Sequence, residues 1–123
     1  MCFTMEGRKK GFYLGTEVVG KRWFKRYLKD RLFARGNGLY WFGEDGFYFL
    51  RYLTRRPIFI PFSDILEITL GTKHAGRWAM GNLIVKIIWR KDGLILSSGF
   101  LVSRKRENAI ALKADLEEKM HVV

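Results

Sequence analysis

Apolar and polar residues alternate over several short stretches between residues 36 and 100, and glycines separate these stretches. The clearest alternation runs from Leu83 to Trp89, where every second side chain is apolar and β-branched residues are frequent. A period of two residues is typical of a strand with one buried face. A turn that ends in Gly93 follows, and a second apolar run comes after it, so residues 83–100 are predicted to form a hairpin.

Further strands are predicted upstream of this hairpin. Two of them flank the turn Gly43–Gly46 and form an earlier hairpin. Pro57 and Pro61 enclose another strand, which is predicted to bend or to lie at a sheet edge because proline cannot donate to a strand ladder. The region 71–82 is either a long loop or a loop with one more short strand. The sheet is therefore predicted to have six or seven strands, six of them at residues 39–42, 47–53, 57–61, 65–70, 83–90 and 94–100.

Two helices are predicted outside the strands. Residues 17–33, with Thr16 and Glu17 at the start, place basic side chains on one arc and aromatic side chains on the opposite arc. This composition is typical of helices that lie on membrane surfaces. Alternatively, the aromatic stripe packs on the sheet and the basic face meets solvent. Residues 103–120 are predicted to form a C-terminal helix that Ser103 caps.

The length of 123 residues fits one domain. We expect a mainly β protein: an antiparallel β-sandwich or partly open barrel, closed at one end by the C-terminal helix, with an appended basic N-terminal helix. Residues 1–16 are expected to be a basic lead-in segment, either mobile or docked on the sheet as a strand, and residues 17–123 to be the domain. The predicted core contains Leu39, Trp41, Phe49, Ile58, Ile60, Leu66, Ile68, Leu83, Val85, Ile87 and Leu116.

The order of these elements carries a family resemblance. The stretch IPFSDI at residues 60–65 joins two predicted strands, and an Asp92–Gly93 turn with an apolar strand ending in Phe100 precedes the C-terminal helix. Over residues 38–120 this order resembles the pleckstrin-homology-like (PH-like) superfamily, most closely its GRAM and bacterial PH-like branches. The resemblance implies a PH-like sandwich that acts as a non-catalytic binding module.

Two features depart from the phosphoinositide-binding members of that superfamily. Those members place Lys and Arg around the turn that joins their first two strands, whereas the predicted counterpart, Gly43–Gly46, is acidic. They also carry a tryptophan in the C-terminal helix, and residues 103–120 contain none. These differences argue against specific phosphoinositide recognition and favour the GRAM-like branches.

The formal net charge of +11 is concentrated near the N-terminus, where residues 1–36 hold ten Lys and Arg against three acidic residues. A field of this sign attracts anionic partners. A second basic cluster precedes the strand at residues 57–61. The predicted site for an anionic surface comprises Lys21, Arg22, Lys25, Arg26, Lys29, Arg55 and Arg56.

The start of the C-terminal helix is a further candidate anion site, formed by Arg104, Lys105 and Arg106. Cations are unfavourable in the first turn of a helix, and a bound anion would reverse that effect. The alternative is a solvated basic cluster. His74 lies in a loop with two cations and is expected to be solvated, with phosphate binding or pH sensing as the alternative.

No catalytic or metal-binding pattern is found. The two histidines lack metal-ligand spacing, and no nucleophile elbow, phosphate-binding loop or zinc-protease helix is present. The single cysteine, Cys2, excludes an internal disulfide. We therefore expect neither an enzyme nor a cofactor or metal.

Three functions remain as hypotheses. The first is reversible docking on an anionic phospholipid membrane. The second is a protein-interaction or assembly module that uses its sheet face or helices. The third is nucleic-acid binding, with Tyr40, Trp41 and Tyr48 stacking on bases unless they fill the core. Neither a membrane span nor a signal peptide is recognised, so we expect a cytoplasmic protein with or without peripheral membrane attachment.

Overall fold

The computed structural model describes residues 8–19, 35–74, 77–78 and 81–120. In this part of the chain one antiparallel sheet accounts for most of the structure, with a short 3₁₀ turn, a small separate hairpin and one α-helix. The elements are β1 (Lys9–Val18), β2 (Gly36–Phe42), β3 (Gly46–Arg51), β4 (Ile58–Pro61), η1 (Phe62–Asp64), β5 (Ile65–Gly71), β6 (Lys73–His74), β7 (Arg77–Trp78), β8 (Ile84–Lys91), β9 (Leu94–Leu101) and α1 (Arg106–Met120).

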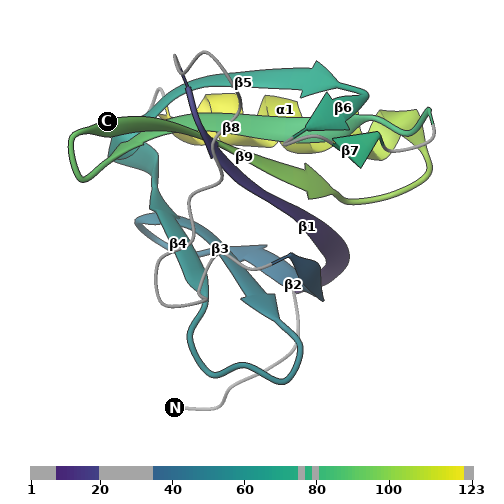
Figure 1. Cartoon of the computed structure of the whole chain (residues 1–123), viewed down its shortest axis with the longest axis horizontal. Coiled ribbons are helices and arrows are strands. Elements are labelled where there is room, and N and C mark those ends of the chain that lie inside the picture. Colours follow the sequence, from purple (N-terminus) through teal and green to yellow (C-terminus); the bar gives the residue numbers. More distant parts are fainter. Residues whose placement is uncertain (1–7, 20–34, 75–76, 79–80, 121–123) are drawn as a thin grey trace.

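Strand β1 holds the sheet together. The seven strands are ordered β4-β3-β2-β1-β9-β8-β5. The first half of β1 pairs with β2 and its second half pairs with β9, with a register shift between Tyr13 and Gly15. Gly15 has a φ of 106°, which a residue with a side chain rarely adopts. Figure 1 shows the result: β1 curves from the layer of β2, β3 and β4 into the layer of β5, β8 and β9.

The core lies between these two layers and is rich in aromatic rings. Tyr13, Phe47, Phe49 and Phe100 are each at most 1% exposed. Neighbouring rings among these four have centroids 5.1 to 5.9 Å apart, in the tilted or edge-on geometry that aromatic pairs prefer. Strands from both halves of the sheet therefore meet in one continuous core.

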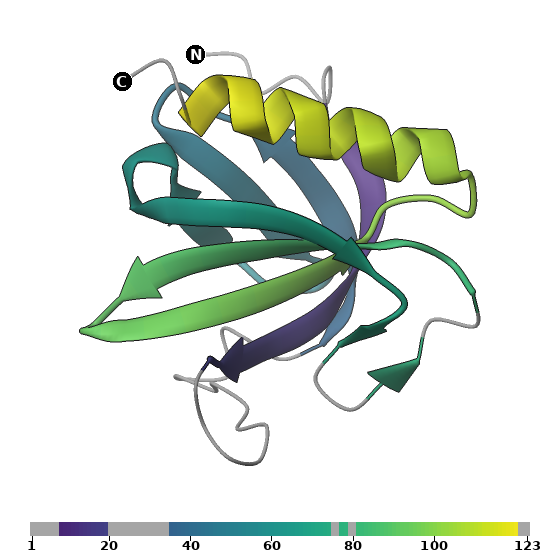
Figure 2. The same ribbon diagram turned by 90° about the horizontal axis from the view of Figure 1, so that it is seen from above.

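Helix α1 covers one open side of the curved sheet (Figure 2). Its buried residues are Ala109, Leu112 and Leu116, and it packs against β5, β8 and η1. The oxygen of Ser103 accepts hydrogen bonds from the Lys105 N–H (3.0 Å) and the Asn108 amide (2.9 Å). The predicted C-terminal helix is confirmed, although it begins three residues later than the predicted start at residue 103.

All six strands predicted by residue range are present, and β1 is the seventh strand of the sheet. The sequence left undecided whether the region 71–82 contains a short strand. The structure has two short strands there, β6 and β7, which pair as a hairpin. A helix starting at Thr16 and Glu17 is wrong, because both residues lie in β1. Residues 9–16 are correspondingly part of the sheet. Val18 also lies in β1, and residues 20–33 of the predicted N-terminal helix lie outside the described residues.

The predicted core is right for seven of its members and needs correction at four. Leu66 is 38% exposed because a bulge between Ile65 and Glu67 turns both Ile65 and Ile68 inward. Leu39 and Trp41 are only half-buried. Their neighbour Tyr40 is the residue that faces the core, opposite Phe49, so Leu39 and Trp41 point to the other side of the sheet. Leu83 is partly buried at the edge of the core.

Candidate functional site

The connection between β3 and β4, residues 52–56, forms an exposed tip with both apolar and basic side chains. Leu53 is fully exposed, with a relative exposure of 106%, and Tyr52 is 47% exposed. Leu53 also has a φ of 65°, a left-handed conformation that is uncommon for residues other than glycine. Arg55 and Arg56 follow in the same tip and are exposed.

The turn that presents Leu53 is fixed by hydrogen bonds. The carbonyl of Arg51 accepts from the Thr54 N–H at 3.2 Å and from the Thr54 hydroxyl at 2.5 Å. The Tyr52 N–H donates to the carbonyl of Asn37 at 2.9 Å. These contacts hold residues 51–54 against the start of β2, so the outward direction of Leu53 follows from the backbone of the turn.

A shallow hollow of about 360 Å³ adjoins the tip. Tyr52 and Asn37 line it together with Lys10 from β1 and Arg104 from the segment before α1. It contains two cationic side chains and no carboxylate. The hollow therefore brings Arg104, one residue of the predicted anion site at the helix start, onto the same surface as the β3–β4 tip.

The other residues of the predicted sites are placed as follows. Arg104, Lys105 and Arg106 are all exposed, and Ser103 already accepts the N–H of Lys105. The five basic residues predicted between residues 21 and 29 lie outside the described residues. The chain re-enters the described structure at Arg35, whose Nε donates to the carbonyl of Leu14 at 2.7 Å.

The order of the strands corrects the comparison of the turn Gly43–Gly46 with the turn that joins the first two strands in phosphoinositide-binding members of the superfamily. The first two strands of the sheet are β1 and β2, so the connection between them spans residues 19–35. The acidic turn Gly43–Gly46 instead joins the second strand to the third. The connection 19–35 carries all five basic residues predicted between residues 21 and 29. The acidic turn therefore gives no argument against specific phosphoinositide recognition.

The outer face of β2, β3 and β4 carries a row of aromatic side chains. Trp41 stacks on Tyr48 with centroids 5.3 Å apart and ring planes at 4°, and Tyr48 meets Phe59 at 4.7 Å. The guanidinium carbon of Arg8 lies 4.0 Å from the centroid of the Trp41 ring. We call Trp41, Tyr48 and Phe59 the aromatic row. The sequence placed Trp41 in the core, and only the strand register reveals that this aromatic surface faces outward.

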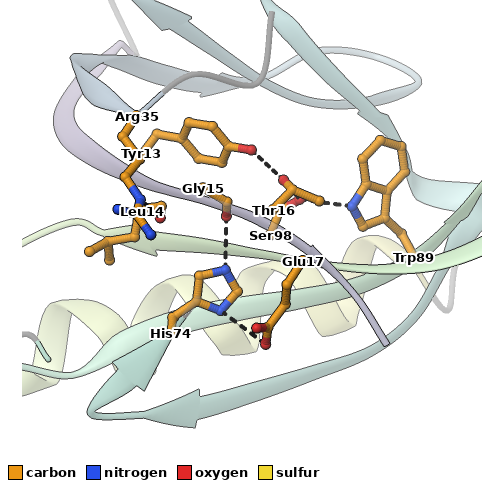
Figure 3. Close-up of polar contacts among 9 residues, drawn as sticks. All are labelled: Tyr13, Leu14, Gly15, Thr16, Glu17, Arg35, His74, Trp89 and Ser98. Atoms are coloured by element: carbon orange, nitrogen blue, oxygen red, sulfur yellow. Dashed lines mark hydrogen bonds and ion pairs between the residues drawn. The ribbon is translucent and has the colours of Figure 1, made fainter. Parts of the chain in front are cut away.

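A buried hydrogen-bonded chain links β1 to β8 and β9 beneath the sheet surface (Figure 3). The hydroxyl groups of Tyr13 and Thr16 are hydrogen-bonded, and the Thr16 hydroxyl lies 2.6 Å from that of Ser98. The indole N–H of Trp89 donates to the same Ser98 oxygen at 2.9 Å. The chain satisfies four buried polar groups and fixes the register of β1 on β9, so we assign it a structural role.

His74 is buried, in contrast to the expected solvated position. Its Nε2 lies 2.8 Å from the carbonyl of Gly15, and its Nδ1 lies 3.9 Å from a carboxylate oxygen of Glu17 (Figure 3). The ring also packs on Gly99, where an added Cβ would lie 2.5 Å from His74 Cδ2. His74 thereby attaches the β6–β7 hairpin to β1 and β9. Burial lowers the pKa of His74 to about 4, which the positive charges of Lys86 and Arg35 assist.

No group of three or more His, Cys, Asp or Glu side chains among the described residues is placed to hold a metal ion. No helix within the described ranges is long and apolar enough to cross a membrane.

A curved antiparallel sheet that one long strand folds into two layers, with a C-terminal helix over one side, defines the PH-like class of domains. Residues 4–115 match the family described as Bacterial PH domain-like, and the chain belongs to this family. Comparisons with curated proteins and with solved structures found no significant match. PH-like domains are generally non-catalytic binding modules that commonly bind lipids or proteins. The predicted superfamily is confirmed, and a binding module is the class of function that follows.

Proposed function

We propose that this domain docks reversibly on anionic phospholipid membranes through the β3–β4 tip and the basic residues around it. The observation that carries the proposal is the composition of the tip: Leu53 is fully exposed and Tyr52 about half exposed, beside the exposed Arg55 and Arg56. One exposed leucine is ordinary on a protein surface. A leucine that a hydrogen-bonded turn holds outward in a left-handed conformation, next to two arginines, matches a membrane interface.

Rough energies indicate how much the tip supplies. Burying Leu53 among lipid chains is worth about 1.5–3 kcal/mol. Each basic residue near an anionic leaflet adds about 1 kcal/mol, so Arg55 and Arg56 add roughly 2 kcal/mol together. A total of about 3.5–5 kcal/mol corresponds to weak, reversible attachment. Stronger docking requires further basic residues.

The proposal assigns that supplementary charge to residues close to the tip. Lys10 and Arg104 share the adjoining hollow with Tyr52. Lys105 and Arg106 follow Arg104 at the start of α1 and belong to the same proposed surface. The proposal also retains Lys21, Arg22, Lys25, Arg26 and Lys29, because the chain continues from them through residues 30–36 to Asn37, whose carbonyl accepts the Tyr52 N–H.

A protein-interaction module is the second candidate, and the aromatic row favours it. Phe59 at the end of the row is 37% exposed and belongs to β4, an edge strand of the sheet. Aromatic side chains are enriched in protein interfaces. The row gives less support to nucleic-acid binding, because base stacking needs a free ring face. Arg8 and Tyr48 both lie against the ring of Trp41, and Tyr40 is buried.

Vesicle sedimentation tests the apolar part of the tip. Leu53→Asn should preserve the fold, because asparagine tolerates the left-handed conformation better than leucine. We expect its affinity for mixed phosphatidylserine–phosphatidylcholine vesicles to fall about tenfold, since the lost transfer energy is about 1.4 kcal/mol or more. Ile110→Asn on α1 is the matched control, because Ile110 is 53% exposed and lies outside the tip. Equal losses in the two variants would contradict the proposal.

The same assay tests the basic part. The double variant Arg55→Glu, Arg56→Glu lowers the net charge by four units. At about 1 kcal/mol per unit of charge, its binding to the phosphatidylserine vesicles should drop below detection. The control Arg90→Glu with Lys119→Glu makes the same change in net charge at exposed positions on β8 and α1 and should retain most of the binding. Equal binding of the unmodified protein to vesicles of phosphatidylcholine alone would exclude docking driven by anionic lipid.

A further inference from the structure

A hollow lies between α1 and the strands β1 and β2. Because α1 packs against β5, β8 and η1, its other side leaves a groove of about 560 Å³ toward β1 and β2. Asn108, Ala111, Leu112 and Asp115 form the helix wall of this groove. Their spacing of three, four and seven residues places them on one stripe of the helix, about 10 Å long at 1.5 Å per residue.

The volume and the lining match a site for a small organic molecule. Small-molecule sites usually measure about 300–1,000 Å³ and combine apolar walls with a few polar groups. Here Phe42, Val102 and Leu112 are partly or fully buried apolar residues of the lining. Ala111 is exposed on the helix wall, and its single methyl group leaves the groove open.

The charged groups of the lining determine which sign of charge on a ligand is favourable. Lys9 and Lys10 contribute two positive charges from β1, and Asp115 contributes one negative charge from α1. The sum is +1, which a monoanion balances. Burial raises the pKa of the Tyr40 hydroxyl, with a smaller contribution from Asp115, so Tyr40 keeps its proton at neutral pH and offers a donor in the groove.

We propose that this groove binds a small amphipathic carboxylate. Its apolar body contacts Phe42, Val102 and Leu112, and its carboxylate lies within reach of Lys9 and Lys10. Asp115 repels a second negative charge and thereby disfavours dianions such as phosphate monoesters. Leu53, Arg55 and Arg56 of the β3–β4 tip do not line this groove, although Lys10 and Val102 line both the groove and the hollow beside the tip.

Octanoate is a suitable probe, with 1-octanol and acetate as controls that lack the charge and the apolar body respectively. In ¹H–¹⁵N correlation spectra, octanoate should produce saturable shifts at Tyr40–Phe42 and along residues 108–115. We expect at least tenfold weaker binding for either control. Shifts that spread evenly over the protein, or equal affinity for octanoate and octanol, would overturn the proposal.

Two variants locate the ligand. Ala111→Trp fills the groove from an exposed helix position and should weaken octanoate binding at least tenfold. Ala114→Trp is the matched control, because Ala114 is exposed on the same helix and does not line the groove. Lys9→Gln with Lys10→Gln, which alters only exposed side chains, should reduce octanoate affinity to that of octanol. Unchanged octanoate binding in either groove variant would overturn the site. Vesicle sedimentation of Ala111→Trp tests tip docking separately, because Ala111 does not line the hollow beside the tip.

Discussion

At the scale of single residues, His74 has the most constrained chemistry. Its Nδ1 is the one buried side-chain nitrogen or oxygen in the described part of the chain without a hydrogen-bond partner. Nε2 faces the carbonyl of Gly15 and therefore carries the proton of the neutral ring. The Glu17 carboxylate at 3.9 Å is beyond hydrogen-bond distance of Nδ1. The folded protein thus favours the neutral, Nε2-protonated form of His74.

This preference predicts a loss of stability in mild acid. The pKa of His74 is about 4 in the folded protein and 6.5 in the reference state, so the unfolded chain binds more protons between these two values. The contribution of His74 is complete above pH 6.5 and falls as the pH drops toward 4. The expected decrease in unfolding free energy is about 2 kcal/mol between pH 7 and pH 4.5.

Urea unfolding at the two pH values, with His74→Gln as the reference, measures this decrease. The glutamine amide can donate to the Gly15 carbonyl but does not titrate, so the variant should show a flatter pH dependence. Parallel pH profiles for the two proteins would show that His74 does not titrate in this range. The comparison also separates His74 from the carboxylates, which both proteins share.

At the scale of elements, the bulge in β5 decides which of its side chains stabilise the core. Ile68 is 3% exposed and Leu66 is 38% exposed, although both were predicted core positions. Ile68→Ala should therefore lower the unfolding free energy by about 2–5 kcal/mol, as is usual for buried aliphatic residues. Leu66→Ala should cost about 0.5–1 kcal/mol, because the side chain already contacts solvent. Equal losses in thermal or urea unfolding would mean that Leu66 is also buried.

The aromatic row shows the same dependence on register. Tyr40 and Trp41 are adjacent in β2, yet Tyr40 packs in the core and Trp41 stacks on Tyr48 outside it. A strand exposes alternate residues on opposite faces, so the pairing of Tyr40 with Phe49 fixes both positions. Two aromatic surfaces, one internal and one external, follow from a single choice of register.

At the scale of the whole molecule, the net charge of +11 gives the proposed docking a testable salt dependence. Lys25→Glu with Lys29→Glu reverses four units of charge in the segment 19–35. The proposal places both lysines on the docking surface, so we expect nearly unchanged unfolding, within about 0.5 kcal/mol per substitution. Binding to phosphatidylserine vesicles should fall to the level seen at high salt, because screening and charge reversal remove the same attraction.

Sedimentation of this double variant over a range of salt concentrations provides the measurement. Leu53→Asn is the counterpart, because it should lower vesicle affinity by a similar factor at low and at high salt. If the double variant Lys25→Glu, Lys29→Glu binds vesicles with the same salt dependence as the unmodified protein, the segment 19–35 is not part of the docking surface.

The sequence by itself determined the elements whose signal is local. Apolar patterns over four to eight residues predicted the strands β2–β5, β8 and β9, and a helical period predicted α1. The order of these elements was enough to predict the superfamily. The basic pair Arg55 and Arg56 was recognised from the local sequence, and its exposure agrees with the rule that charged residues are rarely buried. Each of these features depends on neighbours in the chain.

Only the tertiary structure decided the features that depend on distant partners. Strand β1 contains Gly11 and Gly15 and lacks a clear alternation, and its strand form follows from pairing with β2 and β9 on either side. The burial of His74 needs Gly15, and the groove needs a helix that begins more than sixty residues after β2. Periodicity identifies a strand and its two faces, whereas pairing, bulges and helix docking choose which face becomes core and which becomes binding surface.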